Sequence, residues 1–252
     1  MKTRIIFFGS DNYSQVVESA LRRDKRFVLV NSLEDKPEVG IIASYGRIIT
    51  NNIINSIPKG ILNVHPSLLP KYRGPTPVQT AIVNGEAKTG VTIFKIDEEI
   101  DHGPILAQAE EVVWGSETAE SLYLRLFKIG AELLLRGLPD YLNDQVELKA
   151  QDHSQATFTK KLSRNSGFIP ITAVAKALKG EDFASDGMAP LSKDLFITEF
   201  HPLTPEEIER IIRAFYPWPG SWTLLCETDP YDILVLKTIS LWVYPAYPAH
   251  PC

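Results

Sequence analysis

Residues 4–64 alternate between short apolar runs and segments of helical periodicity, and this alternation constrains the possible folds most strongly. The runs that predict strands cover residues 4–8, 27–30, 39–44 and 60–64. Residues 13–21 carry apolar side chains at helical spacing, and residues 48–57 predict a shorter helix that ends at Pro58. Because the strands are apolar on both faces, the pattern indicates a doubly wound α/β fold with a mostly parallel sheet. Such sheets bind ligands beyond the carboxyl ends of their strands.

The rest of the chain predicts a second set of elements. Helices are expected at residues 76–83, 116–138 and 205–215. Strands are expected at residues 90–96, 222–226 and 233–242, with a strand pair or extended segment at 104–113 and an irregular, Pro-rich end at 244–252. Periodicity is weak from about residue 150 to 200, which predicts a connecting region. We therefore expect a catalytic domain at residues 1–150, a linker at 151–203 and a small, truncated, β-rich C-terminal domain at 204–252.

Composition narrows the possible partners and compartments. With a net charge of −5 the chain is unsuited to wholesale nucleic-acid binding, and we expect no DNA partner. A local basic patch remains possible at residues 22–26, although a solvated helix end explains that cluster better. Cys226 and Cys252 are too few for a disulfide framework, and they have no partner cluster for a metal. No apolar run approaches the ~18 residues of a membrane span, so we expect a cytoplasmic protein without metal or membrane.

Polar residues that could perform chemistry stand in two places. Asn63 and His65 lie two apart on a strand, so their side chains face the same way, and Pro66 ends that strand. Asp101 opens a tight turn that contains Gly103 and Pro104. Taken singly, each residue is better explained as a cap, a satisfied histidine or a turn residue. Their order and their placement beside strands make them candidates as a set.

The sequence of residues 63–74, Asn-Val-His-Pro-Ser-Leu-Leu-Pro-Lys-Tyr-Arg-Gly, resembles the folate-dependent formyltransferase family. The family motif continues with an aspartate about thirty-six residues after the histidine, and Asp101 is the thirty-sixth residue after His65. The family includes methionyl-tRNA, glycinamide-ribonucleotide and amino-sugar formyltransferases. The likeness touches most of the chain, and it is dense at residues 39–108 and 205–222.

The resemblance implies a Rossmann-like catalytic domain, no metal, and 10-formyltetrahydrofolate as the formyl donor. It implies that Asn63, His65 and Asp101 form the catalytic set. The expected folate-binding positions are Ala43, Ser44, Tyr45, Gly46, His102 and Gly103. The expected substrate-binding positions, on a mobile loop over the cleft, are Ser67, Leu68, Leu69, Pro70, Lys71 and Arg73. Lys71 and Arg73 would either meet an anionic substrate or be exposed loop charges.

Two blocks, residues 73–79 and 210–222, look like the methionyl-tRNA branch of the family, which predicts initiator methionyl-tRNA as acceptor and a role in translation initiation. Two features depart from that branch. Only ten residues separate Val30 from Ile41, where the branch carries a long basic loop, and only thirty follow Trp222. An amino-sugar nucleotide or another small amine is therefore an alternative acceptor. A non-catalytic folate-binding or regulatory protein is a third hypothesis, and the intact catalytic set argues against it.

Overall fold

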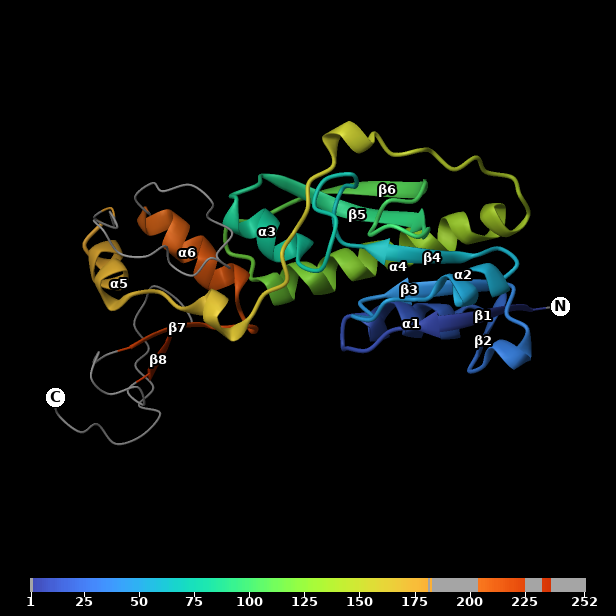
Figure 1. Cartoon of the computed structure of the whole chain (residues 1–252), viewed down its shortest axis with the longest axis horizontal. Coiled ribbons are helices and arrows are strands. Elements are labelled where there is room, and N and C mark those ends of the chain that lie inside the picture. Colours follow the sequence, from blue (N-terminus) through green and yellow to red (C-terminus); the bar gives the residue numbers. More distant parts are fainter. Residues whose placement is uncertain (1, 181, 183–203, 225–232, 237–252) are drawn as a thin grey trace. The chain divides into compact units, whose positions relative to one another are not determined.

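The computed structural model describes residues 2–180, 182, 204–224 and 233–236 (Figure 1). The chain forms two compact units. The first consists of residues 1–77, 87–113 and 121–159, and the second of residues 78–86, 114–120 and 160–252. The domain boundaries expected from the sequence, near residues 150 and 203, stay predictions.

A six-stranded sheet forms the frame of the first unit. Its strands are β1 (Thr3–Phe8), β2 (Phe27–Val30), β3 (Val39–Ala43), β4 (Ile61–His65), β5 (Lys88–Lys95) and β6 (Ile105–Val112). They lie in the order β2-β1-β3-β4-β5-β6, in which β1 to β4 pair in parallel and β5 is antiparallel to both of its neighbours. Since β5 alone runs against the others, the mostly parallel α/β fold predicted from the sequence is confirmed. Residues 105–112 form one strand rather than a pair.

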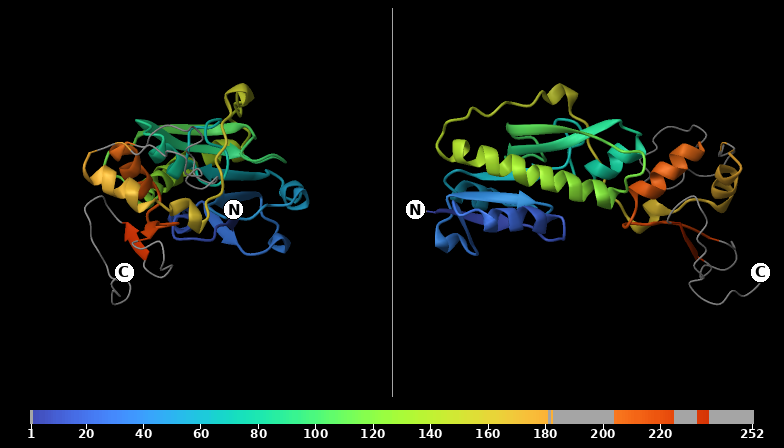
Figure 2. Two further views of the ribbon diagram at one scale, coloured as in Figure 1. Left: turned by 60° about the vertical axis from the view of Figure 1, so that its left-hand side comes forward. Right: turned by 180° about the vertical axis from the view of Figure 1, so that it is seen from behind.

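Helices cover both faces of this sheet. They are α1 (Ser14–Arg23), α2 (Asn51–Ser56) and α4 (Ala119–Leu142). Gly130 lets α4 approach the sheet closely, since a Cβ there would lie 2.6 Å from Val64 Cγ1 and 2.9 Å from Val91 Cγ2. Figures 1 and 2 show α4 running along one face from opposite viewpoints. On the other face Ile53 and Ile54 of α2 pack on a cluster of buried isoleucines.

Several helix ends differ from the sequence-based prediction; α4, for example, begins at Ala119 rather than at residue 116. The helix expected at residues 48–57 begins at Asn51, because Thr50 has extended backbone (φ −74°, ψ 152°) and is the N-cap. The helix expected to end at residue 138 continues through Pro139 to Leu142. Its last turn is anchored because the buried Tyr141 donates its hydroxyl hydrogen to the carbonyl oxygen of Lys59. Tertiary contact thus outweighs the helix-ending preference of proline here.

The second unit contains the short helix α3 (Pro77–Val83), of which residues 78–83 belong to it, followed by α5 (Ile171–Leu178), α6 (Pro205–Ala214), and the antiparallel strands β7 (Ser221–Leu224) and β8 (Ile233–Leu236). Helix α6 begins at Pro205 as predicted, and a capping box of Thr204 and Glu207 starts it. The stretch of weak periodicity contains one helix that the sequence did not predict, α5, which buries Ala173, Val174 and Ala177. A helix this short, made largely of small residues, gives little periodic signal.

Several predictions fall on residues outside the described ranges. They include both cysteines, the carboxyl ends of the strands expected at 222–226 and 233–242, and the Pro-rich end. Across the described part of the chain, no helix combines the length and apolarity that a membrane crossing requires.

Candidate active site

Strand β4 positions the first two candidate residues. Ile61, Asn63 and His65 alternate with Leu62 and Val64, and because Val64 faces α4, the two polar side chains lie on the opposite face. His65 is 4% exposed, and the ring of Phe94 meets it edge-on at 6.3 Å between centroids. Asn63, opposite Phe94 in the ladder, is half-buried. Two consecutive positions of one face thus carry an amide and an imidazole.

The hydrogen bond of His65 assigns the proton on its ring. Nε2 lies 3.0 Å from the carbonyl oxygen of Tyr72, and because a carbonyl can only accept, Nε2 is the nitrogen that donates. In the neutral ring Nδ1 is therefore unprotonated, and it faces Asp101 Oδ2 at 3.6 Å. That separation exceeds a direct hydrogen bond, so the carboxylate acts on the imidazole through its charge. His65 can accept a proton at Nδ1, and Asp101 stabilises the resulting cation.

Asp101 reaches His65 by a route that strand order alone does not suggest. Since β5 is antiparallel to β4, its last residue, Lys95, pairs with Leu62, three positions before His65. Residues 96–101 must therefore fold back along the sheet. Asp101 adopts left-handed backbone (φ 48°), and the N–H of Gly74 donates to its Oδ2 at 2.7 Å. The structure thus brings together the three residues predicted as the catalytic set.

The loop after β4, residues 67–74, is packed against the sheet rather than open to solvent. The hydroxyl of Thr92, which is fully buried, donates to the Ser67 carbonyl at 2.6 Å and accepts from the N–H of Leu69 at 3.1 Å. Lys71 is exposed, as the sequence predicts. Arg73 is 3% exposed, so the prediction that it is an accessible loop charge is wrong. The prediction that the loop contacts the substrate stays a prediction for its other named residues, Ser67, Leu68, Leu69, Pro70 and Lys71.

The segment after α4 also belongs to this region, and no sequence pattern predicted it. Its Gln151, 6% exposed, bonds Arg73, Asp101 and Gly103. Its His153 accepts a hydrogen bond from Arg73 and stacks on His102, with ring centroids 3.9 Å apart. A single glutamine in a polar stretch has no periodicity or motif of its own, and for that reason sequence reasoning missed it. Thr92 was missed because it lies inside a strand pattern.

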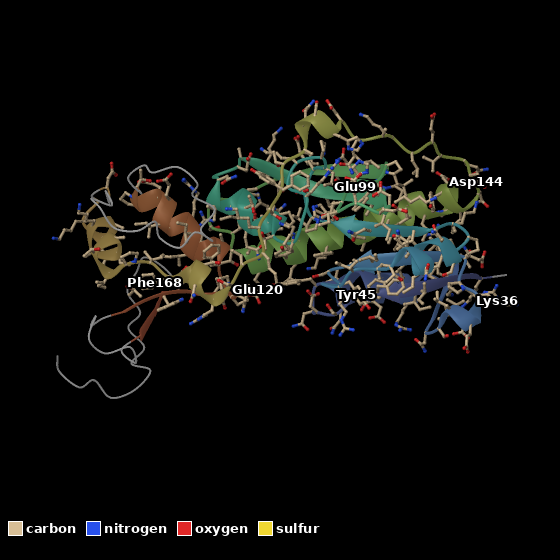
Figure 3. All side chains as sticks on the ribbon, viewed as in Figure 1. Lys36, Tyr45, Glu99, Glu120, Asp144 and Phe168 are labelled. Carbon is tan, nitrogen blue, oxygen red and sulfur yellow. The ribbon has the colours of Figure 1, made fainter. Side chains whose placement is uncertain are left out.

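The predicted folate-binding positions lie in two places on the first unit. Ala43 ends β3, and Ser44, Tyr45 and Gly46 follow it beside the end of β1, where the order of strands reverses and doubly wound sheets hold ligands. Ser10 fixes that turn by donating to the carbonyl oxygens of Ser44 and Tyr45, each at 3.0 Å, and Figure 3 labels Tyr45 there.

The other two predicted folate positions follow Asp101. Nδ1 of His102 lies 2.7 Å from Asp97 Oδ2, so this histidine is a partnered, quarter-exposed residue. A Cβ at Gly103 would lie 1.9 Å from the carbonyl oxygen of Lys95, so only glycine fits. Within the described residues, no group of three or more His, Cys, Asp and Glu side chains could hold a metal ion.

An amide donor, an imidazole and a carboxylate at the carboxyl end of β4 are suited to attack of a nucleophile on an acyl carbon. Residues 4–138 match the family model described as formyl transferase, which is more than half of the chain. The chain belongs to the formyl transferase family.

Comparisons with known proteins agree. Over 188 residues the chain is 42% identical to the methionyl-tRNA formyltransferase of Chloroflexus aurantiacus. The aligned residues cover 75% of this chain and 51% of that protein. The chain thus spans about half the length of the curated relatives it matches. Methionyl-tRNA formyltransferase from Clostridium thermocellum has the same fold, with a TM-score of 0.62 at 17% identity over 92% of this chain and 96% of that one. HypX from Aquifex aeolicus in complex with tetrahydrofolic acid superposes with a TM-score of 0.67 at 18% identity, over 89% of this chain and 36% of that one.

Proposed function

We propose that the chain transfers a formyl group from 10-formyltetrahydrofolate to the amino group of initiator methionyl-tRNA. The observation that carries the proposal is the convergence of Asn63, His65 and Asp101, with Nδ1 of His65 facing the Asp101 carboxylate at 3.6 Å. The acceptor is supported by the 42% identity to a methionyl-tRNA formyltransferase. The cytoplasmic location expected from the sequence accompanies this role in translation initiation.

The chemistry follows from what each side chain can donate or accept. Bound 10-formyltetrahydrofolate supplies the formyl carbon. Asn63 donates an amide hydrogen to the negative charge that develops on the formyl oxygen, and one such donor is commonly worth about a hundredfold to a thousandfold in rate. His65 takes the proton that the attacking amine releases, at Nδ1, since Nε2 is held by Tyr72. Asp101 stabilises the imidazolium that results. As the bond between the formyl carbon and N10 of the folate breaks, the imidazolium gives its proton to N10, and tetrahydrofolate leaves.

The turn at residues 43–46 could accept a folate donor because its backbone at Gly46 is open to solvent. A Cβ added at Gly46 would meet nothing within 4 Å, so the backbone there is accessible to a flat heterocycle. Tyr45 is held against Phe8, with ring centroids 5.6 Å apart, and offers an aromatic surface beside that backbone. Ala43 to Gly46 would therefore hold the pterin, with His102 and Gly103 on the Asp101 side.

An amino-sugar nucleotide is the second candidate acceptor, because the connection between β2 and β3 is short. Residues 31–38 contain only a single 3-10 turn, Leu33–Asp35, capped by Ser32. The long basic loop that the resemblance associates with tRNA contact has no room there. The catalytic chemistry would be the same with either acceptor.

The test supplies purified protein with 10-formyltetrahydrofolate and, in separate reactions, charged initiator methionyl-tRNA or an amino-sugar nucleotide. We expect formyl-methionine after mild hydrolysis of the tRNA product and no formylated sugar. Formylation of the sugar alone would replace the first acceptor by the second. No product with either acceptor, from protein that binds the folate, would favour the non-catalytic folate-binding hypothesis.

A further inference from the structure

We propose that Gln151 is a positioning residue for Asp101. It belongs to a strap, residues 151–159, that lies outside the matched residues 4–138 yet contacts both the Asp101 turn and the loop at 67–74. The inference rests on the proposed function, because it assigns a role in the same reaction. It concerns how the carboxylate is held and not which acceptor is used.

The side-chain amide of Gln151 ties the Asp101 turn together. Its Nε2 donates to the carbonyl oxygen of Asp101 at 2.9 Å and to that of Gly103 at 2.7 Å. Asp101 has left-handed backbone (φ 48°), a conformation that is unfavourable for a residue with a side chain. Two hydrogen bonds from one buried amide offset that cost and fix where the carboxylate points.

Arg73 fixes the orientation of that amide. Its Nη2 and Nε donate to Gln151 Oε1 at 2.7 and 3.3 Å, so a flipped amide would place its NH2 group against these donors and its oxygen against two carbonyl oxygens. Nη2 also donates to Nδ1 of His153 at 2.8 Å, which makes His153 a neutral ring protonated at Nε2. Gln151 and His153, which accept these hydrogen bonds from the Arg73 guanidinium, therefore both belong to the strap. Arg73 fixes the orientation of the Gln151 amide, and that amide fixes the backbone of the Asp101 turn.

The strap and the loop are also joined through their backbones. The N–H of Arg73 donates to the carbonyl of Thr157 at 2.8 Å, and the N–H of Thr159 donates to the carbonyl of Arg73 at 2.7 Å. Gly74, whose N–H holds the Asp101 carboxylate, has no space for a Cβ, which would lie 2.8 Å from Thr159 Oγ1. Gln151 thus holds the backbone carbonyl of Asp101, and Gly74 holds its carboxylate. Gln151 belongs to the strap, and Gly74 packs against it, so the strap positions both groups.

Gln151→Glu separates a positioning role from a merely structural one. Glutamate has the same shape and still accepts from Arg73, but it has lost the two N–H donors to the carbonyls of Asp101 and Gly103. We expect kcat to fall by about tenfold to a hundredfold, since misplacing a catalytic group by about 1 Å can cost that much. KM for both substrates should change less than twofold. Gln151→Met, which lacks the donors without adding charge, should lose kcat to a similar extent.

The matched control is Gln155→Glu. Gln155 lies in the same strap but is exposed and donates to Asp152 at 2.7 Å, so this variant adds the same charge without touching the Asp101 turn. Its kcat should equal that of the unaltered protein. Hydrogen exchange of residues 97–104 gives a readout independent of activity, and it should become faster in Gln151→Glu and Gln151→Met but not in Gln155→Glu.

The outcomes separate this inference from the proposed function. Unchanged exchange at residues 97–104 in both Gln151 variants overturns the positioning role whether or not the protein is active. So does an active unaltered protein whose Gln151→Glu variant keeps its kcat. Faster exchange in a protein that forms no formylated product would support the positioning role and reject the proposed function.

Discussion

The candidate site has two parts that are held in different ways. Asn63 and His65 belong to β4, whose backbone is hydrogen-bonded to β3 and β5 on either side. Asp101 lies on a turn that returns along the sheet and is held by Gly74 and Gln151. The first part is placed by a regular ladder and the second by individual side chains and loop backbone. Replacements should therefore damage the two parts differently.

The largest effect is expected in the strand-held part, at His65. His65→Ala removes the group that accepts the amine proton in the proposed mechanism, and kcat should fall by about 10²–10⁴-fold. Single-turnover formation of formyl-methionyl-tRNA measures it, with circular dichroism to check the fold. A variant that keeps its rate would mean that the proton leaves by another route.

Asn63→Ala should cost slightly less. Loss of one donor to a developing oxyanion commonly lowers kcat by about 10²–10³-fold, while KM for the folate should change little. Asn52, exposed on α2, is the matched control, and Asn52→Ala should leave kcat unaltered. Equal kcat values in Asn63→Ala and Asn52→Ala would show that Asn63 does not stabilise the oxyanion.

The packing behind β4 predicts the third effect, on stability. Gly130→Ala places a methyl group 2.6 Å from Val64 Cγ1, and overpacking of this kind lowers the free energy of unfolding by about 1–3 kcal/mol. Gly137 is in the same helix, but a Cβ there would meet Leu106 at an ordinary 3.6 Å. Gly137→Ala should therefore raise the free energy of unfolding by up to about 1 kcal/mol, through helix propensity. Urea titration measures both, and a Gly130→Ala variant as stable as Gly137→Ala would contradict the close approach.

The smallest effect concerns the far end of α4. Burial, with a smaller contribution from the charge of Asp144, raises the pKa of Tyr141 to about 12; Figure 3 labels Asp144 just beyond the end of this helix. An unfolded tyrosine loses its proton near pH ~10, so between about pH 10 and 12 the folded state holds a proton that the unfolded state has lost. Stability should fall with rising pH in that window. The fall should be shallower in Tyr141→Phe, and equal slopes would contradict the shift; formyl transfer at neutral pH should be unchanged.

The contrast between the two parts also explains what the sequence could predict. Periodicity is a local property, and it predicted the strands, their helices and the shared face of Asn63 and His65. The turn at Asp101 was also a candidate from the sequence, and the resemblance to the family joined Asp101 to Asn63 and His65 as a catalytic set. Neither indicated that β5 runs antiparallel, which forces residues 96–101 to fold back, or that Arg73 is buried against Gln151. Those features depend on contacts between residues distant in sequence, such as the 78 positions from Arg73 to Gln151, and such pairings leave no periodic pattern.

Asp101 gives the most direct test, because it joins the two parts of the site. Asp101→Asn keeps the shape of the side chain and an acceptor for the Gly74 N–H, and it removes the charge that faces His65. We predict that single-turnover transfer from 10-formyltetrahydrofolate to methionyl-tRNA proceeds in the unaltered protein and slows by about a hundredfold or more in the variant, as general acid–base catalysis is lost. Transfer at the unaltered rate in Asp101→Asn would contradict the catalytic set.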